Sequence, residues 1–426
     1  MTKYPGGGSS ARSAFAASGK TSRTRGISRR VRQITISAIK EMPLLASRLG
    51  DCVSLGQGIP SFPTPMHIRE AVCSAMRNES DSGKYSLGPG MPALRRAVSS
   101  YLLTERGVQA DPDSEICVTV GAMEGLSAAV LTLVDRGDEV ILPSPNYASH
   151  IEQVLLAEGV PVFAPLDALT WQLDPDAMRS AVTPKTRAII LCNPHNPTGA
   201  NFSRQSLEAV VRLAVENDLF IIADETYDFL IYDGQPFCSL TSFPELRNRL
   251  IALFSFSKKY AMTGWRVGFV FAPADILDNI MKVHDAVAIC APTLSQYAAM
   301  AALEGPQDCV EKMRSILQAR RDLIMGRLKR MRNHFSAIRP RGAYYLMAKF
   351  NVPGVDSMTY ALKLLNEARV ITIPGAAFGP HGEHHLRMSF GGTEEELVEA
   401  FDRMERWLAG SPFGDDASFK EAGPPA

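Results

Sequence analysis

The sequence has no excess of charge of either sign. Its 45 Lys and Arg residues are balanced by 45 Asp and Glu residues, so charge favours neither nucleic acid nor a membrane surface as the main partner. Long apolar runs are also absent, because charge or glycine interrupts each stretch within about a dozen residues, whereas a membrane-spanning helix needs about twenty. These absences predict a soluble protein that acts on a small molecule.

Cysteine is sparse. The seven cysteines are scattered without a C-x-x-C pair, mostly in apolar segments, which is typical of reduced core thiols in a cytoplasmic protein. His381, His384 and His385 lie close together in the chain and invite a metal hypothesis. No cysteine is near them, and we expect no bound metal.

The length of 426 residues and the hydrophobic content of 46% allow two domains with substantial cores. Residues 1–33 are rich in Ser, Gly, Ala and Arg and contain no acidic residue. That composition suits an organellar transit peptide or a disordered arm. We expect an arm, because no apolar face is evident, although import is not excluded. Residues 411–426 are expected to form a flexible tail.

Short apolar runs alternate with helical segments between residues 116 and 271. Runs that are apolar on both faces predict a mostly parallel sheet covered by helices, with a ligand at the carboxyl ends of its strands. After residue 307 the pattern changes to a charged amphipathic helix, strand-like residues 343–347, a helix near 358–368 and an apolar run at 386–390, which together predict a smaller α+β domain. The strands expected in the sheet are 116–120, 139–142, 188–192, 219–223, 250–254 and 267–271.

The stretch 255–268 is the most informative feature of the chain. Lys258 is flanked by Ser255, Ser257 and Arg266, and apolar runs precede and follow the whole stretch. A lysine amine forms a Schiff base with a carbonyl compound, and hydroxyl and guanidinium groups suit a phosphate. A solvated loop is the alternative, but the apolar surroundings argue against it. The stretch therefore points to pyridoxal phosphate.

Three other places carry polar groups at the ends of apolar runs or within them. Residues 120–125 precede a helix expected at 126–133, where free N–H groups would bind an anion, although a simple tight turn is the alternative. Asp224 ends a buried run and needs a cation such as a pyridinium nitrogen, unless it caps a following helix. Arg387 lies in an apolar strand, where its guanidinium would bind a ligand carboxylate or form an internal salt bridge.

Residues 255–266 resemble the S-x-S-K-x-x-x-x-x-G-x-R signature of class I/II aminotransferases, and further motifs follow in the family's order from about residue 37 to about residue 408. The sequence is identified as a member of this aspartate-aminotransferase-like group of fold-type I pyridoxal-phosphate enzymes. The resemblance implies an α/β fold, with a large cofactor-binding domain at residues 61–306 built on a mostly parallel seven-stranded sheet flanked by helices. It also implies a smaller α+β domain made of residues 34–60 and 307–410.

The resemblance assigns a role to each candidate cofactor residue. Lys258 carries pyridoxal 5'-phosphate because it directly follows S-x-S, and Lys259 does not. The residues implied to hold the phosphate are Ala122 and Met123, through their amides, with Ser255, Ser257 and Arg266. The residues implied to contact the ring are Asn196 and Tyr227 at the phenolic oxygen, Asp224 at the nitrogen, and Tyr147 by stacking.

The resemblance also assigns the substrate contacts. Arg387, in an R-x-S-F pattern, would clamp the α-carboxylate, with Asn196 and the backbone of Gly58 nearby. Tyr85, in a Y-x-x-x-x-G loop, would reach the phosphate of the neighbouring subunit and make the active unit a homodimer. A surface β-turn is the alternative for that loop.

The function implied is transfer of an amino group from an α-amino acid to a 2-oxo acid through an internal aldimine and a ketimine, with Lys258, Asp224 and Tyr227 as catalytic residues. Another pyridoxal-phosphate reaction, β-lyase-like or aminocyclopropane-carboxylate-synthase-like, is the alternative. A non-catalytic cofactor-binding regulator is remote, because the short N-terminal segment leaves no room for a DNA-binding module. The resemblance also implies that some aspartate-specific relatives hold the distal carboxylate with a lysine or with hydroxyls at positions that match Met123 and residues 36–39. These are largely apolar here, so we expect neutral or aromatic donors to be preferred to aspartate.

Overall fold

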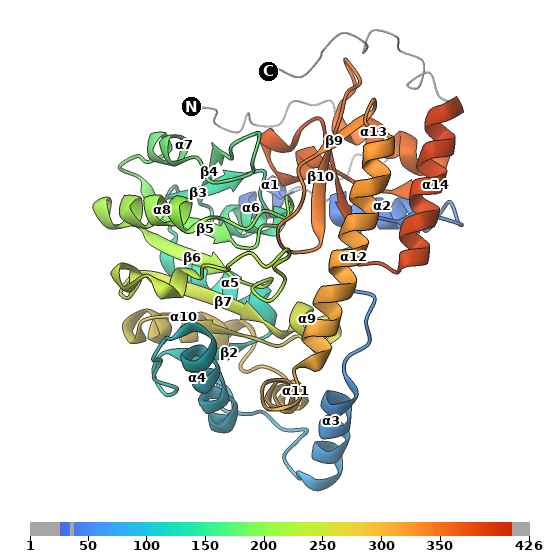
Figure 1. Ribbon diagram of the computed structural model, residues 1–426. Coiled ribbons are helices and arrows are strands. Elements are labelled where there is room, and N and C mark those ends of the chain that lie inside the picture. The colour runs from blue at the N-terminus through green and yellow to red at the C-terminus, as the bar shows by residue number, and fades with distance from the viewer. Residues whose placement is uncertain (1–25, 35–37, 411–426) are drawn as a thin grey trace.

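The structure, a computed structural model, describes residues 26–34 and 38–410. Most of the segment predicted as an arm therefore lies outside the described residues, and only helix α1 (Arg29–Gln33) is seen at its end. The expected tail at 411–426 also lies outside them, as do residues 35–37. Figure 1 shows a large sheet with its helices beside a smaller group of strands and helices.

The large sheet has seven strands in the order β2-β8-β7-β6-β5-β3-β4. Strands β4, β3, β5, β6 and β7 pair in parallel, whereas β8 runs antiparallel to both β7 and β2. The prediction of a mostly parallel seven-stranded sheet is confirmed. The strands are β2 (Ile116–Thr119), β3 (Glu139–Ser144), β4 (Val160–Pro165), β5 (Thr186–Cys192), β6 (Phe220–Asp224), β7 (Leu250–Ser255) and β8 (Gly268–Phe271).

Strand β4 is the one member of this sheet that the apolar runs did not predict. It contains Pro161 and Pro165, which lack the N–H group that a central strand needs. The strand lies at the edge of the sheet and pairs only with β3. Proline is tolerated at such an edge because one side of the strand has no hydrogen-bonding partner to satisfy.

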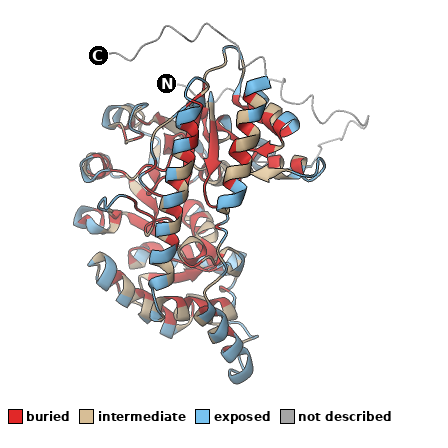
Figure 2. Ribbon diagram, turned by 45° about the vertical axis from the view of Figure 1, so that its right-hand side comes forward, coloured by how far each residue is buried: buried red, intermediate tan, exposed pale blue. Residues whose placement is uncertain are grey.

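Helices cover both faces of the sheet, because alternate strand residues point to opposite sides. Val140 and Leu142 pack into one apolar cluster, whereas Ile141 between them packs into the other. Figure 2 shows the resulting buried layers between exposed helix faces. The first cluster includes α5 (Gly121–Leu133), α6 (Ala148–Leu156) and α10 (Ala274–Val287), and the second includes α4 (Pro92–Arg106), α8 (Arg204–Glu216) and α11 (Thr293–Glu304).

The smaller part confirms the predicted α+β composition. Its antiparallel sheet has the order β12-β13-β10-β9, and a separate parallel pair joins β1 (Val53–Ser54) to β11 (Val370–Ile371). The domain boundaries at residues 60 and 307 stay a prediction. The other elements are α2 (Ala38–Ala46), α12 (Asp308–Arg330), α13 (Ser357–Lys363), α14 (Glu394–Gly410), β9 (Phe335–Ala337), β10 (Tyr345–Phe350), β12 (Ile373–Pro374) and β13 (His385–Ser389).

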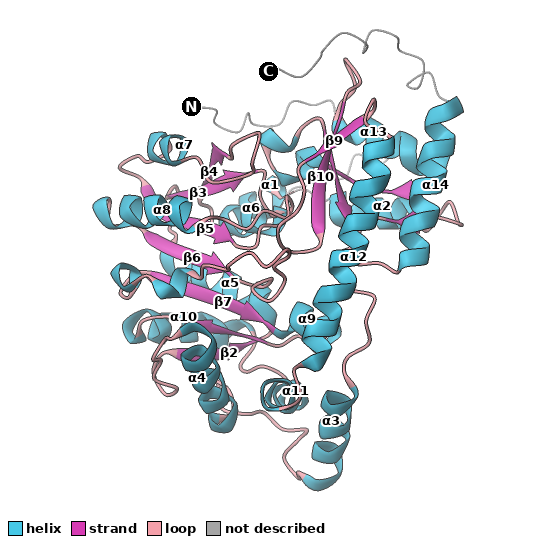
Figure 3. Ribbon diagram, in the orientation of Figure 1, coloured by secondary structure: helices cyan, strands magenta, loops and turns pink. Residues whose placement is uncertain are grey.

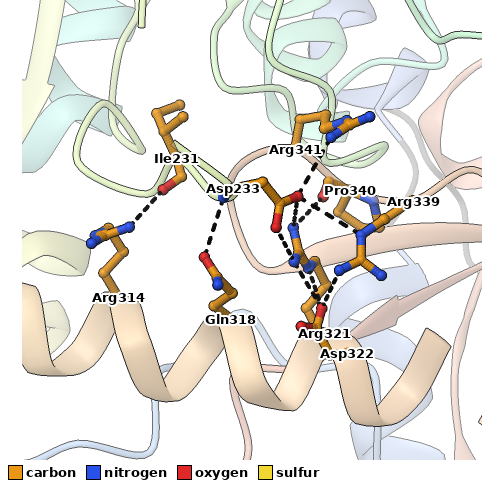
Figure 4. A network of polar contacts seen from close by, with 9 residues as sticks. All are labelled: Ile231, Asp233, Arg314, Gln318, Arg321, Asp322, Arg339, Pro340 and Arg341. Carbon is orange, nitrogen blue, oxygen red and sulfur yellow. Dashed lines mark hydrogen bonds and ion pairs between the residues drawn. The ribbon is translucent and has the colours of Figure 1, made fainter. Parts of the chain in front are cut away.

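The carboxyl ends of β5, β6 and β7 point toward the smaller part (Figure 3). A network of ion pairs fixes this arrangement (Figure 4). The buried Arg321 of α12 donates to both carboxylate oxygens of Asp233, at 2.8 and 2.7 Å, and to the carbonyl oxygen of Pro340 at 3.1 Å. Helix α12 is thereby attached to the loop that follows β6 and to the loop that precedes β10.

Candidate active site

A cavity of about 410 Å³ lies where the carboxyl ends of the parallel strands meet the smaller part. Every predicted site residue except Tyr85 lines it. Residues more than 300 positions apart in the sequence therefore meet in one place. The predicted residues in its wall are Gly58, Ala122, Met123, Tyr147, Asn196, Asp224, Tyr227, Ser255, Ser257, Lys258, Arg266 and Arg387.

Lys258 lies on the short helix α9 (Phe256–Lys259), which directly follows β7. Ser255 caps this helix, since its side chain accepts a hydrogen bond from the Ser257 amide at 3.1 Å. The Lys258 ammonium donates to the carbonyl oxygen of Gly58 at 2.6 Å. Burial, together with the positive charges of Arg266 and Arg387, lowers the pKa of Lys258 to about 8. This amine is therefore far easier to deprotonate than an ordinary lysine.

Lys259 points elsewhere. Its Nζ atom donates to the hydroxyl of Tyr101 at 3.3 Å and lies 4.7 Å from the centre of that ring. It does not line the cavity. Of the two adjacent lysines, only Lys258 reaches the cavity.

An anion-binding corner is built where α5 begins. The helix starts at Gly121, earlier than the predicted residue 126, because Gly121, Glu124 and Gly125 interrupt the apolar pattern at its start. The first amides of a helix have no intrahelical partner, so those of Ala122 and Met123 are donors at a positive helix end. Gly121 has φ +74°, and a β-carbon there would lie 2.7 Å from the guanidinium of Arg266. The glycine thus lets the arginine approach this helix end.

Asp224, the last residue of β6, uses its two carboxylate oxygens differently. One accepts from the amide and hydroxyl of Thr226, at 3.1 and 2.6 Å. Residues 226–229 form a turn and no helix directly follows β6, so the helix-capping alternative is not found. The other carboxylate oxygen lies 3.2 Å from Nε2 of His150, a buried residue of α6 that sequence reasoning missed. Burial alone would raise the pKa of Asp224, but the bonds from His150 and Thr226 outweigh it and hold that pKa below its ordinary value. The carboxylate stays ionised inside the protein.

The rings of Tyr227, Tyr344 and Tyr345 pack against one another beside the cavity. The hydroxyl of Tyr227 lies 3.0 Å from that of Tyr345, which lines the cavity and was predicted only as a strand residue. The hydroxyl of Tyr344 donates to the Gly58 carbonyl at 2.8 Å. A β-carbon at Gly58 would lie 2.3 Å from the Tyr345 hydroxyl, so a side chain there would displace that hydroxyl. Burial raises the pKa of Tyr227 well above its ordinary value, with Tyr345 adding to the shift, and this hydroxyl keeps its proton.

Arg387, on β13, is 1% exposed. Its guanidinium donates to the carbonyl oxygen of Gly56 at 2.7 Å and to Oδ1 of Asn196 at 3.4 Å, between the rings of Tyr345 and Phe378. Within the described part of the chain no carboxylate pairs with it, and its Nε has no partner. The internal salt bridge is therefore not found. Burial lowers the pKa of Arg387, and such a buried cation is suited to bind an anionic ligand.

Tyr85 stands apart from the cavity. It is 78% exposed, although its loop is well held, because Thr293 donates to the Lys84 carbonyl at 2.6 Å and Gln296 donates to the Ser86 hydroxyl at 2.7 Å. The loop therefore presents the tyrosine to the outside of its own chain.

The described residues contain neither a metal-binding cluster nor a membrane-spanning helix. Over residues 26–34 and 38–410, no group of three or more His, Cys, Asp and Glu side chains is arranged to hold a metal ion. His385 instead lies 2.9 Å from the carbonyl oxygen of Glu383. None of the described helices is long and apolar enough to cross a bilayer.

Comparison with known proteins identifies the family of the chain. A family model described as aminotransferase class I and II matches residues 50–404. The chain is 37% identical over 387 residues both to aromatic-amino-acid aminotransferase 2 of Thermococcus litoralis and to the aspartate aminotransferase of Pyrococcus abyssi, covering 90% of this chain and 98% of each relative. The solved aspartate aminotransferase of Thermus thermophilus with maleate has a TM-score of 0.84 at 34% identity, covering 90% of this chain and 99% of that one.

The sheet order, the smaller α+β part and the lysine cavity between them define a fold-type I enzyme. The chain belongs to the aminotransferase class I and II family of pyridoxal-phosphate-dependent enzymes, as its resemblance implied. It is an amino-acid aminotransferase, which sets aside the non-catalytic regulator.

Proposed function

We propose that this cavity binds pyridoxal 5'-phosphate on Lys258 and transfers the amino group of an α-amino acid to a 2-oxo acid. The observation that carries the proposal is a single arrangement: a lysine with a lowered pKa stands between an anion-binding corner and a buried ionised carboxylate. When bound, the cofactor supplies an aldehyde carbon for Schiff-base chemistry and a ring that withdraws electrons. The residues of the cavity suit both the phosphate and the ring nitrogen of this cofactor.

Each residue of the cavity has a defined task. The amides of Ala122 and Met123, the hydroxyls of Ser255 and Ser257, and the guanidinium of Arg266 would hold the phosphate. Asp224 would accept a hydrogen bond from the protonated ring nitrogen, and His150 orients that carboxylate. The hydroxyl of Tyr227 and the amide of Asn196 would donate to the phenolic oxygen, and Tyr147 would stack on the ring. Lys258, once its amine is free, removes and returns the proton of the substrate α-carbon.

The substrate is oriented by its α-carboxylate. The fork of Arg387 binds that carboxylate, and the Asn196 oxygen and the Gly56 carbonyl that already accept from the guanidinium keep it in place. The backbone of Gly58 closes the substrate side. Because one end of the amino acid is fixed, Lys258 meets the same α-hydrogen in each turnover.

The active unit is a homodimer in which Tyr85 reaches the phosphate of the neighbouring subunit. The support is the position of Tyr85 on a well-held loop, exposed and away from its own cavity. All seven cysteines are free, which supports the expected cytoplasmic location.

The preferred amino donors are neutral or aromatic. Among the described residues, the cations that line the cavity are Lys258, Arg266 and Arg387, and each already has a task. The remaining wall includes apolar side chains from three segments, so a second substrate carboxylate would be buried without a partner. These side chains are Ile39, Pro43, Ile59, Met123 and Leu126. Ile36 and Ser37, part of the same expectation, lie outside the described residues.

A half-reaction tests the proposal. The cofactor-loaded enzyme is mixed with phenylalanine alone, and then with 2-oxoglutarate. Transamination predicts one equivalent of 2-oxo acid per site in the first step and one of glutamate in the second. Release of ammonia in repeated turnovers without any acceptor would instead support the β-lyase alternative, and absence of cofactor binding would contradict both.

A further inference from the structure

A buried histidine joins the two segments that are proposed to contact phosphate. His284, near the end of α10, is 0% exposed. Its Nε2 atom lies 3.1 Å from the carbonyl oxygen of Gly88, in the loop that carries Tyr85. Its Nδ1 atom lies 3.1 Å from Oε1 of Glu124, in the first turn of α5.

Glu124 continues the connection. Its second oxygen, Oε2, accepts a hydrogen bond from the Val120 amide at 3.1 Å. Val120 directly precedes Gly121, where the chain turns into the anion-binding corner. One chain of hydrogen bonds therefore runs from the Tyr85 loop through His284 and Glu124 to that corner.

This geometry requires a particular protonation state. A carbonyl oxygen and a carboxylate oxygen only accept hydrogen bonds, and a neutral imidazole has a single N–H. Both contacts of His284 are satisfied together only when both of its ring nitrogens carry protons. Burial opposes this charge, but the Glu124 carboxylate, the Gly88 carbonyl and the charge of Asp285 outweigh it and raise the pKa of His284.

Few other ionisable groups surround this pair in the described residues. Asp285 is on α10 itself, Glu124 comes from α5, and the buried thiol of Cys117 on β2 interacts electrostatically with Glu124 and with Arg95 of α4. Burial and the Glu124 charge, against the opposing charge of Arg95, raise the pKa of Cys117 above its ordinary value. The thiol therefore stays neutral, and His284 is the group whose charge changes first as pH rises.

We propose that His284 is a positioning residue, which as an imidazolium holds the phosphate-binding corner of α5 against the loop of Tyr85. The inference rests on the proposed cofactor site. When His284 loses its proton, one of its two hydrogen bonds is lost, the two segments are no longer held together, and the cofactor phosphate is bound less tightly. Retention of the cofactor should therefore fall as pH rises through the raised pKa of His284.

The protonation state is tested first, in the cofactor-free full-length protein. NMR of ¹⁵N-labelled histidine rings, assigned with His284→Gln, should show both nitrogens of His284 still protonated above the ordinary histidine pKa of about 6.5. In Glu124→Gln the side-chain amide can donate to Nδ1, so a neutral histidine satisfies every contact, and the His284 pKa should fall. A His284 that titrates at or below its ordinary value in the wild type would overturn the inference.

Cofactor retention is tested next, by titrating each cofactor-free protein with pyridoxal 5'-phosphate across the same pH range. Glu124→Gln should bind with an affinity close to that of the wild type at low pH, and should exceed it by about tenfold above the His284 pKa. His284→Gln cannot donate at both ends and should bind weakly throughout. His67→Gln, on α3 (Met66–Asn78) and away from this network, serves as the matched control and should follow the wild type.

The outcomes separate the two proposals. Titrations of the cofactor's own groups are common to all variants and cancel in their ratios. If the wild type and His284→Gln bind the cofactor equally at every pH, the positioning role fails while the proposed function stands. If the wild type binds no pyridoxal phosphate at any pH, the proposed function fails, and the positioning role fails with it, whatever the NMR shows.

Discussion

The ammonium of Lys258 donates a hydrogen bond to the carbonyl oxygen of Gly58 at 2.6 Å, across 200 residues of sequence. A side chain at Gly58 would in turn displace the hydroxyl of Tyr345, which occupies the space beside it. Lys258, which lies just after β7, is therefore oriented by the backbone of Gly58 from the other side of the cavity. Any change that moves this segment should alter the chemistry of the amine.

Separate substitution of each of the two adjacent lysines is the most direct test of the site. Lys258→Ala should abolish turnover and the visible absorbance of the bound cofactor, since no other lysine lines the described cavity. Lys259→Ala should keep both, because this side chain contacts Tyr101 instead. Borohydride reduction followed by peptide mapping identifies the attachment site, and a label found on Lys259 would refute the assignment.

The amine of Lys258 should become reactive near pH 8. Its pKa is lowered to about 8 by burial and by two arginines, so the neutral, nucleophilic fraction rises as pH passes that value. Competitive acetylation of the cofactor-free protein, followed by mass spectrometry, measures this fraction with exposed Lys312 as the internal reference for the reagent. In Arg387→Gln one of the two positive charges is gone, and the midpoint should move to higher pH. A midpoint that stays fixed would show that Arg387 does not act on the amine.

Asp224 should be needed for chemistry rather than for attachment of the cofactor. Asp224→Ala removes the acceptor for the ring proton, and we expect α-proton exchange to fall by about a hundredfold or more while the cofactor stays bound. His150→Phe should cause a smaller loss, because it leaves the carboxylate in place with one contact fewer. Exchange of the substrate α-proton into deuterated water measures both effects, and a wild-type rate in Asp224→Ala would contradict the role.

The position of Tyr85 predicts complementation between subunits. Tyr85→Ala and Lys258→Ala place their lesions in different sites of a mixed dimer, so one site carries both changes and the other carries neither. Random exchange at equal amounts should therefore recover about one quarter of wild-type activity. If exchange is verified by native mass spectrometry and nothing is recovered, the tyrosine serves its own chain.

Donor choice should follow the apolar wall of the cavity. We expect kcat/KM with 2-oxoglutarate to be higher for phenylalanine, methionine or alanine than for aspartate, because a second carboxylate finds no unassigned cation in the described wall. Met123→Lys supplies one and should improve aspartate relative to phenylalanine. A tenfold preference of the wild type for aspartate would reveal a cation that the described residues do not account for.

Local patterns predicted the framework of the site well. Runs such as 219–223 are apolar on both faces and end in a polar residue, so they indicate a covered strand and, at its carboxyl end, Asp224. Because parallel strands share that edge, the separate motifs were expected to meet, and the lining of the cavity shows that they do. Strand β4 was not predicted because its two prolines are atypical of a strand and are tolerated only because it lies at the sheet edge.

Partners that act across long sequence separations were not predictable in this way. His150 contacts Asp224 from 74 residues away, and Tyr345 contacts Tyr227 from 118 residues away. A histidine within a helix and a tyrosine within a strand carry no periodic signal that separates a site residue from a core residue. Only the packing of α6 and β10 against the cavity decides their role.

The buried guanidinium of Arg387 lowers the stability of the folded protein. A charge buried without a carboxylate partner among the described residues loses hydration that two neutral hydrogen bonds and aromatic rings do not return in full. Arg387→Met keeps the length of the side chain without the charge, and it should melt at a higher temperature than the wild type while losing affinity for amino acids. At this position the folded enzyme is less stable because the buried cation is kept for binding a carboxylate. The bound carboxylate restores part of that stability.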